Sequence, residues 1–327
     1  MIVSPTTAVP SATPSPPAAA LEPPGTAVPA KFEPRSATFV STRTGWVLGQ
    51  APCKAGTCDA IVRTHDGGAS WRAIPAPATT PDHLVGIRFA DLRNGFVYGD
   101  FLWVTHDAGA TWRQVPSLAQ VGRLEASHGN VWFFAKGADL RTGSVSSDTF
   151  RPVATGSDGT SLVLHGTTVF TTAYAGHGRT NLLVGSAAGR FTVERTPCAV
   201  DDQPTVGART TSDLLMVCAG GSGAGQEQKS AYLSNTGGKT WTKVGDPPPV
   251  PGTSLFLNLK SVFLFDNRAV EVSRDGGRSW QRSLDGDGIG EGGFESAELG
   301  YAIGDFGSGT AMDLTRDDGR TWSKVAF

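Results

Sequence analysis

The chain has 327 residues, of which 39% are hydrophobic, so it is long enough to form a large core. It carries 28 basic and 30 acidic residues, a formal net charge of -2, which excludes the general positive field that nucleic-acid-binding proteins use. The longest apolar stretch, Leu255 to Phe265, is interrupted by Asn258 and Lys260. It is shorter than the ~18–20 residues that span a bilayer, so we expect no transmembrane segment.

The first 34 residues are predicted to form a disordered tail rich in Pro, Ala and Thr. Met1 to Pro29 contain too little apolar surface to offset the entropy of ordering, which predicts an extended spacer. They lack the basic segment and apolar run of a secretory signal, but spacers of this kind often follow such a signal. We therefore expect an extracytoplasmic protein, secreted or attached to the envelope, whose export signal is not present in this chain.

A repeated octapeptide dominates the rest of the chain. The pattern Ser/Thr-x-Asp-x-Gly-x-Ser/Thr-Trp occurs five times, with copies that end at Trp71, Trp112, Trp241, Trp280 and Trp322, and the third copy has Thr236 in place of Asp. Neighbouring copies are 39 to 42 residues apart, except for a gap of 129 residues before Trp241 that has room for two more units. Phe150 and Phe191 stand at the expected phase within this gap. The sequence therefore contains seven units.

Each unit contains four short apolar runs separated by turns. The second run reads GWVLG at 45–49, GFVYG at 95–99, VWFFA at 131–135, LLMVC at 214–218 and GYAIG at 300–304. Four short strands in ~40 residues are typical of a propeller blade. We predict an all-β fold for residues 35–327, a seven-bladed β-propeller of four-stranded antiparallel blades. The chain would start on an innermost strand and end on an outermost one, without strand exchange, although Ala30 to Phe32 could extend the last blade.

The octapeptide is predicted to be a structural turn. Asp and Ser/Thr side chains bind nearby backbone amides, and Gly supplies the positive φ that a tight hairpin needs. This makes turn acceptors of Asp66, Asp107, Asp275 and Asp317, and it assigns Trp71, Trp112, Trp241, Trp280 and Trp322 to packing between layers. His65 and His106, at the variable second position, are expected to face solvent.

Four cysteines are placed to form two disulfides. Cys53 and Cys58 lie in a loop-like stretch, and Cys198 and Cys218 flank a predicted strand. An even count at such places favours disulfides and an oxidising compartment, although four cysteines allow three connectivities. The competing metal site would need Cys-x2-Cys spacing, which is absent.

The five octapeptides resemble the Asp-box, or BNR, repeats of the sialidase superfamily, and the seven units resemble single-propeller proteins related to the photosystem II stability and assembly factor. The resemblance covers about residues 36–327 and implies the propeller, but the repeat occurs in both enzymes and non-catalytic proteins. Sialidases resemble one another in an early Arg-Ile-Pro motif, three arginines and a tyrosine nucleophile. The nearest string here is Arg195-Thr196-Pro197, in the fourth unit. Packing accounts for Tyr98, Tyr232 and Tyr301, which leaves Tyr174, near His177 and Arg179, as the tyrosine with catalytic character.

Binding residues are expected on the propeller face opposite the octapeptide turns, because loops on a rigid scaffold usually carry function. After the second strands this face should carry Gln50, Asp100, Asp266, Arg268 and Asp305, and the connections between blades should add Asp201, Asp202, Asp285, Asp287 and Glu291. Asp305, Gln50 and Asp100 belong to neighbouring units and could converge on a basic peptide, a sugar or a calcium ion. Alternatively, each caps a strand end. Phe101 and Trp103 flank Asp100 and could stack on a sugar ring.

These features favour an exported, non-catalytic propeller that acts as a protein-interaction or assembly platform. We expect no catalytic residues, metal or cofactor, and a monomer that binds a protein partner or glycan on the loop face and no nucleic acid. One alternative is a sialidase-type glycoside hydrolase that uses Tyr174 or an acidic pair. The other is a lectin-like module that binds carbohydrate through Trp103.

Overall fold

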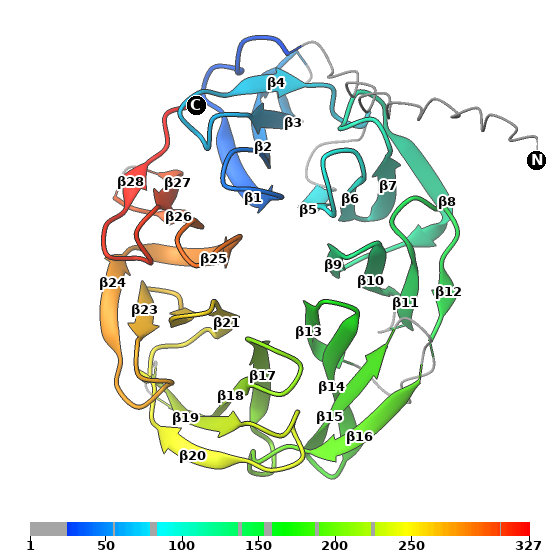
Figure 1. Ribbon diagram of the computed structural model, residues 1–327. Coiled ribbons are helices and arrows are strands. Elements are labelled where there is room, and N and C mark those ends of the chain that lie inside the picture. Colours follow the sequence, from blue (N-terminus) through cyan, green and yellow to red (C-terminus); the bar gives the residue numbers. More distant parts are fainter. Residues whose placement is uncertain are drawn as a thin grey trace, which may run out of the picture.

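The chain forms a ring of seven four-stranded antiparallel sheets (Figure 1), as seen in a computed structural model that describes residues 25–54, 56–78, 84–136, 139–153, 159–186, 190–223, 226–307 and 309–327. The predicted seven-bladed β-propeller is confirmed. None of the described residues belongs to a helix that is long and apolar enough to cross a membrane.

Each of the first four blades is built from four strands that are consecutive in the sequence. Blade 1 consists of β1 (Glu33–Phe39), β2 (Gly45–Cys53), β3 (Gly56–Thr64) and β4 (Arg72–Ile74). Blade 2 consists of β5 (Leu84–Phe89), β6 (Gly95–Gly99), β7 (Phe101–Thr105) and β8 (Arg113–Ala119). Blade 3 consists of β9 (Arg123–Ser127), β10 (Asn130–Ala135), β11 (Asp139–Ser144) and β12 (Arg151–Pro152). Blade 4 consists of β13 (Gly159–His165), β14 (Thr168–Gly176), β15 (Arg179–Ser186) and β16 (Phe191–Arg195).

The last three blades repeat the same order. Blade 5 consists of β17 (Gln203–Ala208), β18 (Leu214–Gly223), β19 (Gln226–Ser234) and β20 (Thr242–Gly245). Blade 6 consists of β21 (Ser254–Leu257), β22 (Val262–Phe265), β23 (Ala269–Ser273) and β24 (Gln281–Asp285). Blade 7 consists of β25 (Asp287–Phe294), β26 (Gly300–Asp305), β27 (Thr310–Thr315) and β28 (Ser323–Lys324).

The first strand of every blade borders the central channel, and the fourth strand lies at the rim (Figure 1). Because neighbouring strands are antiparallel, the octapeptide turns share one face with the turns between first and second strands; we call this the turn face. The connections from second to third strands and from blade to blade form the opposite, loop face.

Each sheet is built from four consecutive strands, so blades 7 and 1 exchange no strand. The ring is closed by side-chain packing instead. The final residue, Phe327, packs its ring 4.9 Å from that of Phe32 and 5.3 Å from that of Trp71. One apolar cluster therefore joins blades 1 and 7. Thr26 forms an antiparallel bridge with Ala73 of β4. The expectation that Ala30 to Phe32 could extend the last blade is wrong, because this segment contributes packing rather than a strand. Contacts with blade 1 thus start before residue 35, and residues 1–24 of the predicted tail lie outside the described residues.

Glycines at the start of second strands leave room for aromatic rings. Gly45, Gly95 and Gly300 pair with the phenylalanines that end the preceding first strands. A Cβ atom at any of these glycines would lie within 2.5 Å of the facing ring. Since such an approach is sterically forbidden, the recurring glycine is a packing requirement.

The octapeptide turns are held by the hydrogen bonds that their composition suggests. In blade 1 the Asp66 carboxylate accepts bonds from the Ser70 amide at 2.9 Å, the Ser70 hydroxyl at 2.6 Å and the Thr64 hydroxyl at 2.8 Å. Equivalent bonds from Ser279 and Thr321 lower the pKa values of Asp275 and Asp317 to about 2. The Thr236 hydroxyl replaces the missing carboxylate in blade 5 and accepts the Thr240 amide at 2.9 Å.

The second position of the octapeptide connects neighbouring blades. His106 Nδ1 lies 2.7 Å from Asn94 Oδ1, and its Nε2 lies 3.1 Å from the Asp148 carboxylate of blade 3. Arg274 donates to the Asp318 carbonyl of blade 7 at 2.8 Å, and Arg316 donates to the Gly67 carbonyl of blade 1. The His106 side chain is partly exposed, as expected, but it also contacts the neighbouring blade, which the sequence did not predict.

Both predicted disulfides are present. Cys53 and Cys58 are joined across the β2–β3 hairpin, and Cys198 joins the connection before β17 to Cys218 in β18. No free cysteine remains in the described chain.

Replacing Trp71 with alanine should weaken the ring at its closure. Trp71 is only 8% exposed and contacts both Phe39 and Phe327, so a cavity there should lower the free energy of unfolding by about 3–5 kcal/mol. Urea denaturation measures this loss, and Trp71→Phe should retain most of the stability. A loss below about 1 kcal/mol for Trp71→Ala would contradict the packing role.

Candidate functional site

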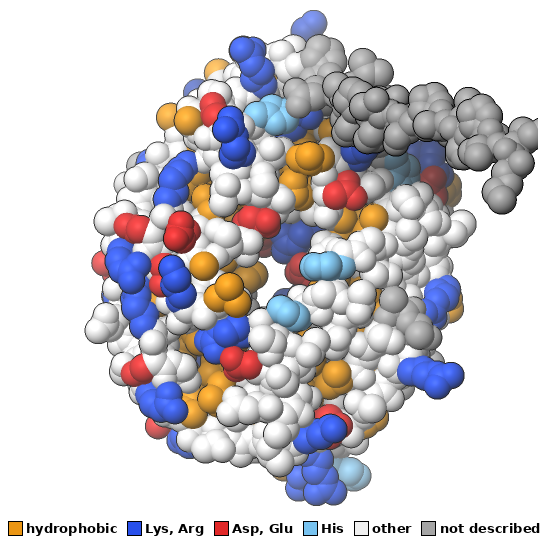
Figure 2. Space-filling model, viewed as in Figure 1, with side chains coloured by type: hydrophobic (Ala, Val, Ile, Leu, Met, Phe, Trp, Pro, Cys, Tyr) orange, Lys and Arg blue, Asp and Glu red, His pale blue; other side chains and the backbone are white. Residues whose placement is uncertain are grey.

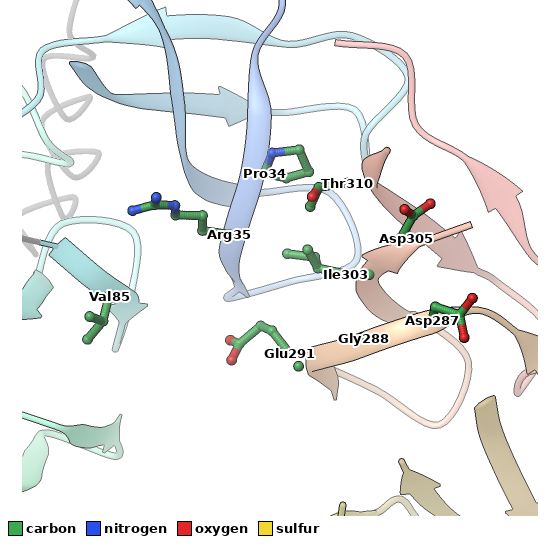
Figure 3. A pocket seen from close by; sticks show the side chains of 11 residues that line it. Pro34, Arg35, Val85, Asp287, Gly288, Glu291, Ile303, Asp305 and Thr310 are labelled. Atoms are coloured by element: carbon green, nitrogen blue, oxygen red, sulfur yellow. The ribbon is translucent and has the colours of Figure 1, made fainter. Parts of the chain in front are cut away.

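A recess of about 470 Å³ lies on the loop face where blades 7 and 1 meet. Residues of β1, β5, β25, β26 and β27 line it (Figure 3). The carboxylates of Asp287 and Asp305 lie together at one end, and Arg35 and Val85 lie at the other (Figure 3).

A bulge in β25 forms the floor of this recess. Asp287 pairs with Asp305 and Glu291 pairs with Ile303, so residues 288–290 stand opposite the single residue Gly304. A Cβ atom at Gly288 or Gly290 would have no neighbour closer than 3.8 Å. Glycines therefore give the recess an open floor, along which another backbone can approach closely.

The recess carries more negative than positive charge. Asp287 and Asp305 are exposed and Glu291 is partly buried, against the single cation of Arg35. One oxygen of Asp305 accepts the amides of Gly307 at 2.8 Å and Gly309 at 3.2 Å, which fixes the carboxylate at the end of the β26–β27 hairpin. This arrangement favours a ligand with a basic group.

A network of charged side chains lies below the recess, inside the channel. Arg88 Nε and Nη2 donate to the two Glu125 carboxylate oxygens at 3.3 and 3.4 Å, and Arg88 Nη1 lies 3.6 Å from Glu291. Glu291 also accepts the Ser36 hydroxyl at 3.0 Å. The Tyr301 hydroxyl lies 2.7 Å from the Ala37 carbonyl and 3.3 Å from Glu291. Blades 7, 1, 2 and 3 are thus connected around one arginine.

Burial sets the protonation behaviour of this network. It raises the pKa of Glu291, even though Arg88 and two hydroxyl groups favour the charged form. It also raises the pKa values of Tyr98 and Tyr301, so both phenols stay neutral. Burial opposes the charge on Arg88, but Glu125 and the surrounding groups hold its pKa above the ordinary value.

All Asp, Glu, Lys and Arg residues of the first strands belong to the same sector of the ring. They are Glu33 and Arg35 in β1, Arg88 in β5, Arg123 and Glu125 in β9, and Asp287 and Glu291 in β25. Strands β13, β17 and β21 contain none. Figure 2 shows side chains of both charge signs beside the central opening.

The predicted convergence of Asp305, Gln50 and Asp100 does not occur. Only Asp305 lines the recess. Gln50 is 8% exposed, because β2 continues to Cys53 and places Gln50 within the ladder opposite Glu33 and Asp59. Asp100 is exposed between β6 and β7, outside the lining.

Other predicted residues of the loop face have different surroundings. Asp266 is fully buried and accepts the amides of Arg268 and Ala269 at 2.8 Å, so it caps a turn, whereas Arg268 is exposed. Asp287 and Glu291, expected in a connection between blades, belong to the first strand of blade 7. Asp285 ends β24 and pairs with Arg282 at 2.9 Å. Asp201 and Asp202 lie in the connection to blade 5, where Asp202 accepts the Ala199 amide at 2.9 Å.

The residues that suggested enzymatic or sugar-binding activity lie elsewhere. Tyr174, His177 and Arg179 occupy the β14–β15 hairpin of blade 4, across the ring from the recess (Figure 1). The Tyr174 hydroxyl accepts the Gly178 amide at 3.1 Å. Trp103 packs against the core between blades 1 and 2, whereas the neighbouring Phe101 is 41% exposed.

Sequence reasoning missed Arg35, Val85, Arg88 and Glu125. The sequence did contain a signal for two of these residues, because a charged residue interrupts an apolar first strand in Ile87-Arg88-Phe89 and in Leu124-Glu125-Ala126. Such a residue has to reach the channel, because both faces of an inner strand pack on neighbouring blades.

A scan against protein-family models and a search of curated proteins found no match. Several solved structures share the fold. A structure of YCF48 bound to D1 peptide is 16% identical, with 91% of this chain and 95% of that chain covered and a TM-score of 0.60. PorZ, a surface component of the type-IX secretion system of Porphyromonas gingivalis, is 12% identical over 93% of this chain and 39% of its own, with a TM-score of 0.60. The β-propeller domain of the Trilobed protease from Pyrococcus furiosus, which has an open velcro topology, is 9% identical. The match covers 92% of this chain and 97% of that chain, with a TM-score of 0.63.

Replacing Arg88 with methionine should make stability depend on pH. Glu125 and Glu291 would lose their shared cation, which should cost about 1–3 kcal/mol at pH 8 because two partly buried carboxylates are left unpaired. Burial already raises the pKa of Glu291, and the loss of Arg88 raises it further, so acid protonates the carboxylate and relieves the cost. The difference in unfolding free energy from wild type should therefore shrink at pH 5.

Urea denaturation at pH 8 and pH 5 measures this difference. Lys243→Met is the matched control, because Lys243 forms an exposed ion pair with Asp246 at 2.7 Å, and such pairs contribute about 0–1 kcal/mol. An R88M penalty of the same size at both pH values would show that the carboxylates do not depend on Arg88.

Proposed function

We propose that this protein is a non-catalytic interaction or assembly platform, whose loop-face recess binds a polypeptide segment carrying a basic side chain. The observation that carries the proposal is the glycine-floored, negatively charged recess between blades 7 and 1.

The lining of the recess suits such a segment. Gly288 and Gly290 leave space for a peptide backbone, and Asp287 and Asp305 offer carboxylates to a lysine or arginine. Exposed Val85 supplies apolar contact beside them. The volume lies within the range of small-ligand pockets, so it admits one or two side chains rather than a folded domain.

The similar structures support an interaction role without fixing the partner. YCF48 holds a D1 peptide, and PorZ is a component of a secretion system. Both share the propeller with this chain at low sequence identity. We assign the octapeptide turns to the Asp-box repeat, on the strength of their recurrent Asp and Ser/Thr hydrogen bonds. The two disulfides support an extracytoplasmic location.

Filling the recess should abolish peptide binding. Gly290 has an ordinary φ and open space around its Cα atom, so Gly290→Trp should fold while its indole occupies the recess. Peptides selected on the wild type from a random ten-residue library should be rich in Lys and Arg. Their affinity, measured by fluorescence anisotropy, should fall about tenfold or more in G290W, a loss of ~1.4 kcal/mol or more.

Gly122→Trp is the matched control, because Gly122 lies on the same face, has an ordinary φ and also faces open space. It should bind the selected peptides as the wild type does. Peptides without basic enrichment, or equal binding by G290W, would contradict the proposal. Glycan-array binding that is lost in G290W would instead assign the recess to carbohydrate.

A further inference from the structure

The channel has a second cavity at its turn-face mouth. Two adjoining hollows of about 280 and 170 Å³ share Phe39, Phe89, Ala126 and Glu295 in their linings. Arg88 lines this mouth cavity and Glu291 lines the loop-face recess. The contact between these two side chains therefore separates the two spaces.

Aromatic rings form the walls of the mouth cavity. Phe39, Phe89 and Phe294 end the first strands of blades 1, 2 and 7, and Phe256 of β21 joins them. The first three rings lie against the glycines that start their second strands, so their positions are fixed by packing. The faces of Phe89 and Phe294 are stacked on Trp46 and Phe263, so the rings offer apolar surface to the alkyl chain of a ligand rather than an open face to its charge.

Glu295 supplies an unsatisfied negative charge at this mouth. It directly follows β25, the residue as a whole is exposed, and no described residue donates a hydrogen bond to its carboxylate or forms an ion pair with it. The channel walls limit hydration on its inner side and raise its pKa to about 7.

The other charged groups of the mouth leave this charge uncompensated. Asp91 caps its own turn by accepting the Arg93 and Asn94 amides at 2.7 and 2.8 Å. Arg88 is shared between Glu125 and Glu291. The mouth thus contains the carboxylates of Asp91, Glu125 and Glu295 but only one cation, that of Arg88. One added positive group would bring the net charge of this lining closer to zero.

We propose that the turn-face mouth of the channel binds a single alkylammonium group, with Glu295 as its counter-ion and the phenylalanine rings as its walls. The ligand is either a lysine side chain of a partner protein or a free polyamine, which present the same chemistry. This site is separate from the loop-face recess and does not depend on the function proposed for it.

Binding at this site should depend on pH with a defined sign. Glu295 must be ionised to pair with the ammonium, and its pKa of about 7 lies between pH 6 and pH 8. Affinity should therefore rise over this interval. His128 and His165 lie at the turns between the first and second strands of blades 3 and 4, on the same face of the ring. A variant of Glu295 is therefore needed to assign the pH dependence to this carboxylate.

The test uses Nα-acetyl-lysine methylamide as probe and its Nε-acetylated form as a neutral control. Isothermal titration of the full chain at low salt should show binding of the charged probe that strengthens about threefold or more from pH 6 to pH 8. In Glu295→Gln the affinity at pH 8 should fall about fivefold, which corresponds to ~1 kcal/mol, and the pH dependence should disappear. Thermal melting checks that this exposed substitution leaves the fold intact.

Glu298→Gln is the matched control, because Glu298 lies in the same turn, is exposed and faces Lys260 at 3.8 Å. It should bind the probe as the wild type does, and so should G290W. Equal binding of the neutral probe, no binding of the charged probe, or a pH dependence that persists in E295Q would each overturn the proposal. If cadaverine displaces the lysine probe at lower concentration than a lysine peptide does, the ligand is a free polyamine; the reverse order identifies a protein lysine.

Discussion

The structure depends on how blade 7 meets blade 1 without exchanging a strand. Every blade of a propeller buries apolar surface against two neighbours, so an open seam would leave two faces exposed to water. Here the rings of Phe32, Phe327 and Trp71 cover the outer part of the seam. Nearer the channel, the Ser36 hydroxyl binds Glu291 and the Tyr301 hydroxyl binds the Ala37 carbonyl. The seam is thus closed by side chains at every radius, and local changes at the seam act on the whole ring.

This mode of closure also explains why the recess lies at the seam. The extra residues of the β25 bulge stand opposite Gly304, and β1 of the next blade does not fill the space beside them. Glu291 takes part in both features, because it lines the recess and contacts Arg88 at 3.6 Å inside the channel. A basic ligand that drew Glu291 into the recess would compete with Arg88, so the proposed binding would act on the seam through this carboxylate.

The sequence was sufficient to predict the fold because its determinants are local. A turn such as Thr64 to Trp71 contains the partners of its Asp66 and Thr64 hydrogen bonds, so its period reveals the blades directly. The candidate site depends on longer-range features. Gln50 looked like the end of a strand, but the bridged β2–β3 hairpin carries the ladder on to Cys53. Residues 287–291 are rich in glycine and looked like a connection, but they begin an inner strand with a bulge. His106 looked exposed because its partner Asp148 belongs to another blade.

The distribution of charge around the channel argues that this sector does more than hold the ring together. Strands β13, β17 and β21 form inner walls without a charged residue, so the propeller does not need charges there to fold. In blades 7, 1, 2 and 3 one arginine is shared by two acids, and partly buried charges of this kind stabilise a fold less than apolar packing of the same volume. Both candidate sites border this group, the recess through Glu291 and the mouth cavity through Arg88 and Glu125. The surplus of carboxylates is confined to the sector where both cavities open, which supports the proposed recognition of positively charged ligands.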